Sequence, residues 1–314
     1  MKVVAIAGGI GAGKFLRGLV RVVEPANLCV VVNTGDDIEM HGLRISPDLD
    51  SVTYWLADEM DRARGWGRRE ETFRATEELA RFDADAAWFG LGDLDLATHL
   101  FRTSQLAAGM TLSDVTAQIA RRFGVPARVL PMTDERVTTR IVVDEAGGER
   151  DLHFQEYWVG RGARDRILRI VFEGVGEAGP APGVLEAIDA ADAVVLCPSN
   201  PVVSIGPVLA VPGMRDAVAS KRPAVVGVSP IVGGAPLGGM ADKVMPAAGL
   251  EVSALGAAEA HRTVLGGWVI DEADRDLASK IEEALDIPVA VTDSVMRDDD
   301  TAEALARATL ALIG

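Results

Sequence analysis

The sequence is poor in cysteine, in positive charge and in long apolar runs, and each shortage excludes a class of protein. Its two cysteines, Cys29 and Cys197, stand in apolar runs, so we expect buried free thiols and exclude a disulfide framework or a cysteine-based metal site. No apolar stretch is long enough to span a bilayer, and Met1 leads directly into a strand pattern rather than a signal peptide. A reducing cytoplasm is therefore the expected location.

Positive charge is scarce because 31 lysines and arginines stand against 47 aspartates and glutamates, which gives a formal net charge of -16. Such a surface repels a phosphate backbone, so we exclude nucleic acid and anionic membranes as partners. A phosphorylated small molecule can still bind such a negatively charged protein where positively charged or amide groups at the site outweigh the overall negative charge. With 314 residues, of which 48% are apolar, the chain is long enough for one elaborated α/β domain.

Short β-branched runs that alternate with helical patterns predict an α/β fold with a doubly wound, Rossmann-like parallel sheet. We expect its core in residues 1–45 and 175–314, and an inserted subdomain of helices and a β-hairpin in residues 46–174. The predicted strands of the core are 3–7, 29–32, 193–196, 224–228, 268–270 and 289–291. The predicted helices are 15–23, 50–82, 113–123, 183–190, 213–220, 274–284 and 301–312. Segments 137–143 and 152–158 alternate like a hairpin turned at Gly147 and Gly148.

A glycine-rich loop, Gly-Gly-Ile-Gly-Ala-Gly-Lys at residues 8–14, directly follows the first predicted strand. Backbone amides at Gly9, Gly11 and Gly13, the start of the next helix and the Lys14 ammonium could all bind a phosphate. The spacing matches GxxxxGK of a P-loop, but Phe15 stands where such a loop needs a hydroxyl for Mg²⁺. This departure argues against an ordinary ATPase or GTPase. The alternative is a tight strand-to-helix turn without a ligand.

Acidic side chains follow the second predicted strand. Asp36 and Asp37 lie in Asn-Thr-Gly-Asp-Asp at 33–37, and Asp48 and Asp50 follow in Ser-Pro-Asp-Leu-Asp at 46–50. Ligands bind outside the carboxyl ends of the strands in open α/β sheets, and Mg²⁺ uses a few carboxylates together with substrate phosphates. We therefore predict metal binding by Asp36, Asp37 and Asp48. The alternatives are an Asx turn at 33–37 and helix capping by Asp48 or Asp50.

Further polar side chains follow other predicted strands or start a helix. Ser199, Asn200 and Ser204 follow the strand at 193–196, and Gly233 lies in a loop after 224–228. Asp93 and His99 stand in Gly-Asp-Leu-Asp-Leu-Ala-Thr-His at 92–99. Each of these segments alone is weak, because such loops are often only turns. Together they describe one crevice at the carboxyl edge of the sheet.

In this order the motifs resemble the 2-phospho-L-lactate transferases and their bacterial counterparts, the phosphoenolpyruvate transferases, over essentially the whole chain. The matching segments are GGIGAGK (8–14), VVNTGDD (31–37), MHGLRISPDLD (40–50), LGDLDLATHL (91–100), PMTDERVTT (131–139), HFQEYWV (153–159), CPSNPVVSIGP (197–207) and SPIVGG (229–234). One departure is that family members often read GDRD where this chain has Asp93-Leu94-Asp95. Lys14, Arg44, Arg102 or Arg136 could supply the missing arginine's charge.

The resemblance implies a transferase of coenzyme F420 biosynthesis that is a homodimer and uses Mg²⁺. Its donor would be a guanosine-diphosphate-linked compound that carries a phosphoenolpyruvyl or 2-phospho-L-lactyl group, with the transferred phosphorus being the terminal one of the diphosphate, and its acceptor would be the deazaflavin alcohol Fo. A ribityl hydroxyl of Fo would attack the phosphorus that bears the small acid, and GMP would leave. Asp36 and Asp50 become the candidate catalytic carboxylates. The candidate donor-binding residues are Gly9, Gly11, Gly13, Lys14, Ser199, Asn200, Ser204 and Gly233, and the candidate Fo-binding residues are Asp50, Trp88, Asp93 and His99.

The flat ring of Fo requires an apolar wall beside acids that bind its hydroxyls. Trp55, Trp66, Trp88 and Trp158 fall in the predicted insert, and we expect at least one of them to line the ring. We also expect Asp50→Asn to reduce transfer without disturbing the fold. Two other functions compete with this one. A nucleotide-sugar-binding regulator of the related gluconeogenesis-factor group would share the glycine loop, and a nicotinamide dehydrogenase would require a true GxGxxG.

Overall fold

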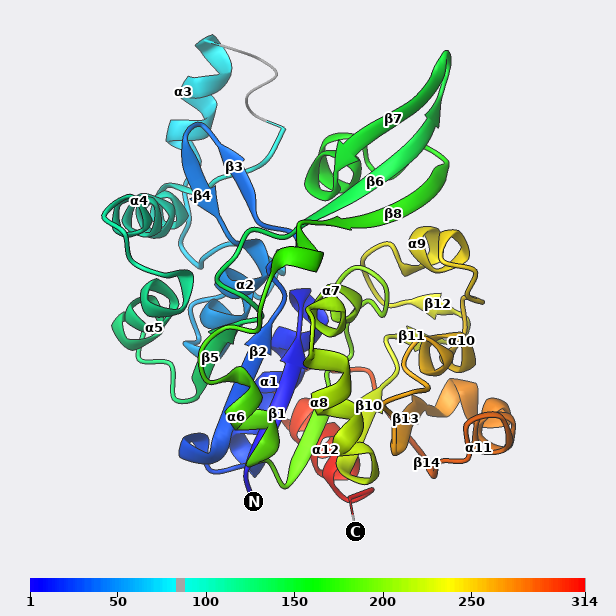
Figure 1. Cartoon of the computed structure of the whole chain (residues 1–314). Helices are drawn as coiled ribbons and strands as arrows, with labels where there is room; N and C mark the ends of the chain where they lie inside the picture. Colours follow the sequence, from blue (N-terminus) through cyan, green and yellow to red (C-terminus); the bar gives the residue numbers. More distant parts are fainter. Residues whose placement is uncertain (83–87, 314) are drawn as a thin grey trace.

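The computed structural model describes residues 1–82 and 88–313 and is built around a seven-stranded sheet (Figure 1). The strand order is β14-β13-β10-β9-β1-β2-β5, and all neighbouring strands are parallel. The strands are β1 (Val3–Ala7), β2 (Leu28–Val32), β5 (Arg128–Pro131), β9 (Ala193–Leu196), β10 (Val225–Val228), β13 (Gly267–Asp271) and β14 (Val289–Thr292). The chain runs outward from β1 in both directions, so the predicted doubly wound α/β fold is confirmed.

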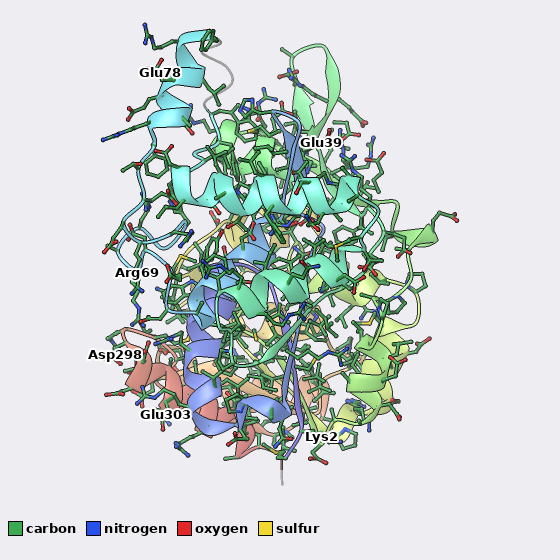
Figure 2. The ribbon with its side chains drawn as sticks, turned by 90° about the vertical axis from the view of Figure 1, so that its left-hand side faces the viewer. Lys2, Glu39, Arg69, Glu78, Asp298 and Glu303 are labelled. Carbon is green, nitrogen blue, oxygen red and sulfur yellow. The ribbon has the colours of Figure 1, made fainter. Side chains whose placement is uncertain are left out.

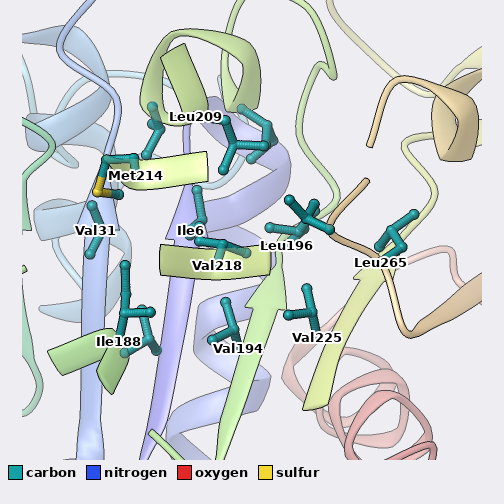
Figure 3. Close-up of a cluster of buried hydrophobic side chains, with 14 of the residues drawn as sticks. Ile6, Val31, Ile188, Val194, Leu196, Leu209, Met214, Val218, Val225 and Leu265 are labelled. Carbon is teal, nitrogen blue, oxygen red and sulfur yellow. The ribbon is translucent and has the colours of Figure 1, made fainter. Parts of the chain in front are cut away.

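Both faces of the sheet are covered by helices because its strands are apolar on both sides. One face packs against α1 (Gly9–Val22), α2 (Pro47–Leu56), α5 (Leu112–Arg122) and α12 (Asp299–Leu310). The other packs against α6 (Val184–Asp189), α7 (Ile205–Ala210), α8 (Met214–Ser220), α9 (Ala241–Ala247), α10 (Ala254–Glu259) and α11 (Ala278–Leu285). Figure 3 shows this second layer, where Leu209 and Val218 lie over Ile6 and Val194. This core fixes the ends of the strands and hence the loops that follow them.

The smaller elements gather at the carboxyl end of the sheet, away from the two termini (Figure 1). Glu39 and Glu78, on two of these elements, lie at the opposite end of the molecule from Lys2 (Figure 2). The hairpin sheet, as we call strands β7-β6-β8, is antiparallel. The elements are β3 (Ile38–Met40), β4 (Leu43–Ile45), α3 (Arg74–Phe82), α4 (Asp93–Ala107), β6 (Thr138–Glu145), β7 (Gly148–His153), β8 (Ile167–Glu173), β11 (Ile231–Val232) and β12 (Ala235–Pro236).

Two predicted elements are wrong in part. The helical stretch 50–82 is interrupted between α2 and α3, where Asp58, Gly65, Gly67 and Glu70 all have positive φ, a backbone conformation that a helix cannot contain. The second hairpin strand ends at His153 rather than 158, and a π-helical turn at Glu156–Gly160 follows. The sequence analysis also missed β3, β4, β5 and β8.

The boundaries of the predicted insert stay a prediction. Strand β5 lies inside residues 46–174, yet it is the edge strand of the main sheet and pairs with β2. The hairpin sheet and α3 lie outside that sheet. Over the described residues, none of the helices is long and apolar enough to cross a membrane.

Candidate active site

The site lies where the strand order reverses, at β1 between its neighbours β2 and β9. Gly8, directly after β1, is the point where the strand-end loops meet. A Cβ placed on Gly8 would lie 2.8 Å from Asp48 Oδ2, 2.8 Å from the Ser204 Cβ and 3.3 Å from the Asn33 Cβ. Only glycine fits there, because real Cβ contacts are longer. Loops that follow different strands therefore converge at the position where open α/β sheets bind ligands.

Residues 33–37, which we call the acid turn, follow β2 and are held by Asn33. Its Oδ1 accepts a hydrogen bond of 2.8 Å from the Gly35 amide, so the predicted Asx turn is present. Its Nδ2 donates to Asp48 Oδ2 at 2.9 Å and to the Val203 carbonyl at 3.4 Å. Asn33 therefore ties the turn to the start of α2 and to the loop after β9. The sequence analysis gave this asparagine no role of its own.

Asp36 and Asp48 form a buried pair of carboxylates. Burial, followed by the charge of Asp48, raises the pKa of Asp36 well above its ordinary value. Burial raises the pKa of Asp48 to about 6, although hydrogen bonds from Asn33 and the Gly9 backbone lower it. Asp36 Oδ1 is buried and has no hydrogen-bond partner in the described part of the chain. An unpartnered oxygen beside a second acid suits a proton or a cation.

Asp37 faces a different side of the acid turn. Its Oδ2 accepts a 2.6 Å hydrogen bond from the Ser46 hydroxyl, and burial raises its pKa to about 7. It lines a pocket together with Thr34, Arg44 and Arg136. Besides burial, the charges of both Asp48 and Asp37 raise the pKa of Asp36, and Asp48 has the larger effect. Because Asp37 is bonded to Ser46, we treat Asp36 and Asp48 as the pair open to a cation, and the metal role of Asp37 stays a prediction.

A buried network surrounds Asp50, the other predicted catalytic acid. Both Asp50 oxygens accept hydrogen bonds from the Arg102 guanidinium, one of them at 3.0 Å. Arg102 Nη1 also lies 3.3 Å from His99 Nδ1, which must accept because arginine only donates. His99 Nε2 lies 3.4 Å from Asp95 Oδ2, and the Tyr54 hydroxyl donates to Asp95 Oδ1 at 2.6 Å. Arg102 thus compensates the charge of Asp50.

The sequence contained a signal for this network. Asp95, His99 and Arg102 follow one another at helical spacing on α4, so they share one face of that helix. Within the described ranges, Asp50, Asp95 and His99 are also the one group of three acidic or imidazole residues whose ligand atoms lie within 4.8 Å of one another. Because Arg102 already places a positive charge on Asp50, we do not assign a metal to this group.

The glycines after β1 serve packing as well as any ligand. A Cβ on Gly11 would lie 2.2 Å from the Pro198 carbonyl oxygen, and one on Gly13 would lie 2.1 Å from Trp55 Cδ1. Gly9 is different because it has a φ of +73° and only Asp48 Oδ1 nearby, at 3.8 Å. Lys14 is partly exposed, and its ammonium has no ion-pair partner among residues 1–82 and 88–313. Lys14 therefore remains open to a phosphate, whereas the Gly9 backbone already bonds to Asp48.

Most polar groups of the other predicted donor loops are already hydrogen bonded. Ser199 Oγ lies 3.4 Å from the Gly8 amide, which donates to it. Asn200 Oδ1 accepts from the amides of Val202 and Val203, and the Gly233 amide donates to Asp274 Oδ2 at 3.0 Å. Ser204 is buried beside Gly8. The roles of these residues in donor binding stay predictions, and their observed contacts shape the loops.

The aromatic residues differ in how much of a ring wall they can offer. Trp55 is 4% exposed and packs on Gly13, and Trp268 is 1% exposed beneath Gly227. Trp66 is 42% exposed. Trp88 is partly buried, and its Cε3 would lie 3.2 Å from a Cβ on Gly160. Trp88, in the segment before α4, therefore packs against the turn that follows β7.

Asp93 has a structural role that the sequence analysis missed. Its oxygens accept hydrogen bonds from the Thr72 hydroxyl and from the amides of Arg74 and Ala75. Those amides belong to the start of α3, so Asp93 caps that helix from a distance in sequence. The predicted contact of Asp93 with Fo stays a prediction, but it would have to share these oxygens.

The buried acids give the metal-free protein a characteristic pH dependence. Raised folded-state pKa values at Asp36 and Asp37 mean that the folded state binds more protons than the unfolded state, so the free energy of unfolding should fall as the pH rises toward and through about 7. The half-buried His153 and the buried His261, with lowered pKa values, act in the opposite direction only below about pH 6.5. Chemical unfolding at several pH values tests this.

In that experiment Asp36→Asn should flatten the slope, and Mg²⁺ should stabilise the parent protein most at the higher pH. Stability of the parent that stays constant or rises over this range would contradict the assigned burial of charge.

Known proteins match this chain over nearly its whole length. The family model described as 2-phospho-L-lactate transferase CofD matches residues 3–310. The chain is 47% identical to a phosphoenolpyruvate transferase of Streptomyces griseus, over 99% of this chain and 98% of the relative. Corresponding proteins of Thermobifida fusca and Mycolicibacterium smegmatis are 47% and 43% identical, over 93% and 100% of this chain and 93% and 99% of theirs.

Solved structures support the fold at lower identity. Two crystal structures of one Bacillus halodurans protein, described in one case as a member of the upf0052 family, give TM-scores of 0.63 and 0.64. They are 17% and 16% identical to this chain, and each covers 98% of it, with 99% and 98% of the solved chains matched.

Proposed function

This chain belongs to the CofD family of 2-phospho-L-lactate transferases, and from that premise we propose that it transfers a phosphoenolpyruvyl group in coenzyme F420 biosynthesis. The donor is a guanosine diphosphate whose terminal phosphorus bears the enolpyruvyl group, the acceptor is a ribityl hydroxyl of Fo, and GMP is released. The relatives' name, phosphoenolpyruvate transferase, favours enolpyruvate over lactate as the acid.

One observation carries the proposal beyond the family likeness. Asp48 of the buried pair lies beside Gly8 and Gly9, and Asp36 interacts with it, at the point where the order of the strands in the sheet reverses. Phosphoryl transfer depends mainly on positioning and on neutralising charge. A carboxylate pair facing a glycine loop provides sites for a cation and for phosphate oxygens within one crevice.

We assign the metal to Asp36 and Asp48. The unpartnered Asp36 Oδ1 and the raised pKa values of both acids fit a divalent cation. Bound there, Mg²⁺ would neutralise charge on the donor phosphates. Asn33 orients Asp48 by donating to its Oδ2, and hydrogen bonds of this kind to a metal ligand hold it in place.

The proposed transfer is direct and requires no covalent enzyme intermediate. The ribityl oxygen forms a bond to the phosphorus bearing the enolpyruvyl group, and the bond from that phosphorus to the GMP oxygen breaks. The hydroxyl proton must go to a base, and our candidate is the Asp36 carboxylate, through the oxygen that does not hold the cation. Asp50 is held by Arg102 instead, so we propose that it shapes the site rather than accepting the proton.

We place the ring of Fo against Trp88. Trp88→Leu should weaken Fo binding roughly tenfold, because leucine lacks the flat face on which a ring stacks. Fluorescence titration of Fo measures the affinity. Phe82→Leu is the control, since Phe82 is 87% exposed on α3. Equal affinities for the parent and Trp88→Leu would place the acceptor elsewhere.

The glycine loop should not support hydrolysis of GTP. Phe15 is fully buried in the layer of α1 that packs on the sheet, so no hydroxyl is available at the position where P-loop enzymes hold Mg²⁺. Phosphate release from GTP, measured without Fo, should stay at the background rate. Sustained GTP turnover by the purified chain would contradict this interpretation of residues 8–15.

Donor competition tests the proposed chemistry. The protein is incubated with Fo, Mg²⁺ and equal amounts of guanylylated enolpyruvate, lactate and glycerate donors, and the products are weighed by mass spectrometry. We expect the enolpyruvyl product to dominate. A dominant lactyl or glyceryl product would change the assigned donor, and no product from any donor would overturn the proposed function.

A further inference from the structure

The hairpin sheet reaches the acid turn through two hydrogen bonds. The Thr139 amide, on β6, donates to the Gly35 carbonyl at 2.6 Å. His153, the last residue of β7, has its Nε2 3.1 Å from the Asp37 carbonyl oxygen. Gly35 and Asp37 flank Asp36 in sequence, so both carbonyls that adjoin the proposed metal ligand are held by the same sheet.

The tautomer of His153 follows from its second contact. The Gln155 amide donates to His153 Nδ1 at 3.0 Å. Because Nδ1 accepts, the ring proton is on Nε2, and Nε2 is the donor to the Asp37 carbonyl. Two backbone groups therefore fix the ring, one from its own strand end and one from a segment 116 residues away.

Packing restricts the turn at the same place. A Cβ on Gly35 would lie 2.7 Å from Thr139 Oγ1 and 3.2 Å from the Pro207 Cβ. Within the turn the Asp37 amide makes only a 3.2 Å bond to the Thr34 carbonyl. The turn thus has weak internal bonding at its end and depends on its neighbours for its shape.

We propose that His153 is a positioning residue, which holds the acid turn in the shape that lets Asp36 and Asp48 bind a divalent cation. It touches neither substrate nor metal in this account. The hairpin sheet is therefore part of the site's framework and not only a wall for the acceptor. The effect on the turn's shape is independent of the proposed function, and the effect on cation binding rests on it.

His153→Phe tests the inference because phenylalanine fills similar space and cannot donate. We expect amides of residues 35–38 to exchange hydrogen faster in mass-spectrometric measurements, and Mn²⁺ affinity, followed by electron paramagnetic resonance without substrates, to fall about tenfold. His153→Gln keeps a donor at a similar reach and should restore most of both. Asp151→Asn, on the same face of β7, removes only an exposed ion pair with Arg140 and should change neither.

The two measurements separate the possible failures. Parental exchange and parental Mn²⁺ affinity in His153→Phe would overturn the inference, as would equal losses in His153→Gln. If the parent itself does not bind Mn²⁺, the proposed metal site fails and the exchange rates alone decide whether His153 holds the turn. Should His153→Phe not fold, His153→Ala replaces it in the same comparison with His153→Gln.

Discussion

Asp48→Asn should lower kcat for transfer by about a hundredfold or more, and excess chelator should abolish transfer in the parent. Losing a carboxylate that holds the cation removes several kcal/mol of charge stabilisation, and about 1.4 kcal/mol corresponds to each tenfold change in rate. The asparagine can still accept the hydrogen bond that Asn33 donates to Asp48. The fold of the metal-free protein should therefore survive, and removal of one of two interacting buried charges should not destabilise it.

Steady-state kinetics with Mg²⁺ titration, together with thermal unfolding in chelator, check both halves of this expectation. Asp151→Asn is the matched control because its carboxylate is 56% exposed and lies on the hairpin sheet. A normal rate in Asp48→Asn, or transfer that continues in excess chelator, would contradict the assignment of the metal.

Arg102→Leu should lower the free energy of unfolding by about 3–5 kcal/mol, because it leaves the charge of Asp50 buried without a partner. Arg102 is 2% exposed, and its guanidinium donates to both oxygens of Asp50. The same reasoning changes the expectation for Asp50→Asn. An asparagine there leaves the Arg102 charge uncompensated, so we now expect a loss of stability as well as of transfer.

Urea unfolding measures this directly through the midpoint and slope. Replacing both Asp50 and Arg102 by leucine should recover part of the loss, since the pair is removed together. Arg169→Leu is the control because its ion pair with Glu149 is 53% exposed on each side, and its midpoint should match the parent's. A parental midpoint in Arg102→Leu would show that the buried pair contributes nothing.

The sequence predicted the central strands because their apolar runs are buried on both faces and end in glycine or polar loops. It missed β5, whose four residues begin with the exposed Arg128 at the edge of the sheet. The predicted helix over 50–82 is broken between α2 and α3, where Gly65 and Gly67 have positive φ that a helix cannot contain. The periodicity of apolar and charged residues does not reveal such breaks, and the glycines have to be considered as well.

The sequence predicted which residues belong to the candidate site better than it predicted their contacts with one another. Strand-end loops had to meet at one edge, so Asp36, Asp48 and Gly9 could be expected near one another. The partners of the other acids could not be predicted, because they come from distant parts of the sequence. Arg102 donates to Asp50, and Asp93 accepts from the start of α3. His153 escaped notice for the same reason, since its partner is a backbone carbonyl 116 residues away.

Product stoichiometry tests the central claim most directly. Fo, a guanylylated phosphoenolpyruvate donor and the protein are mixed with Mg²⁺ or with excess chelator, and the masses and amounts of the products are followed in time. We expect one GMP for each phosphoenolpyruvyl-Fo formed when Mg²⁺ is present, and neither product in chelator. Release of GMP without modified Fo, or equal product in chelator, would contradict a metal-dependent transfer to the deazaflavin alcohol.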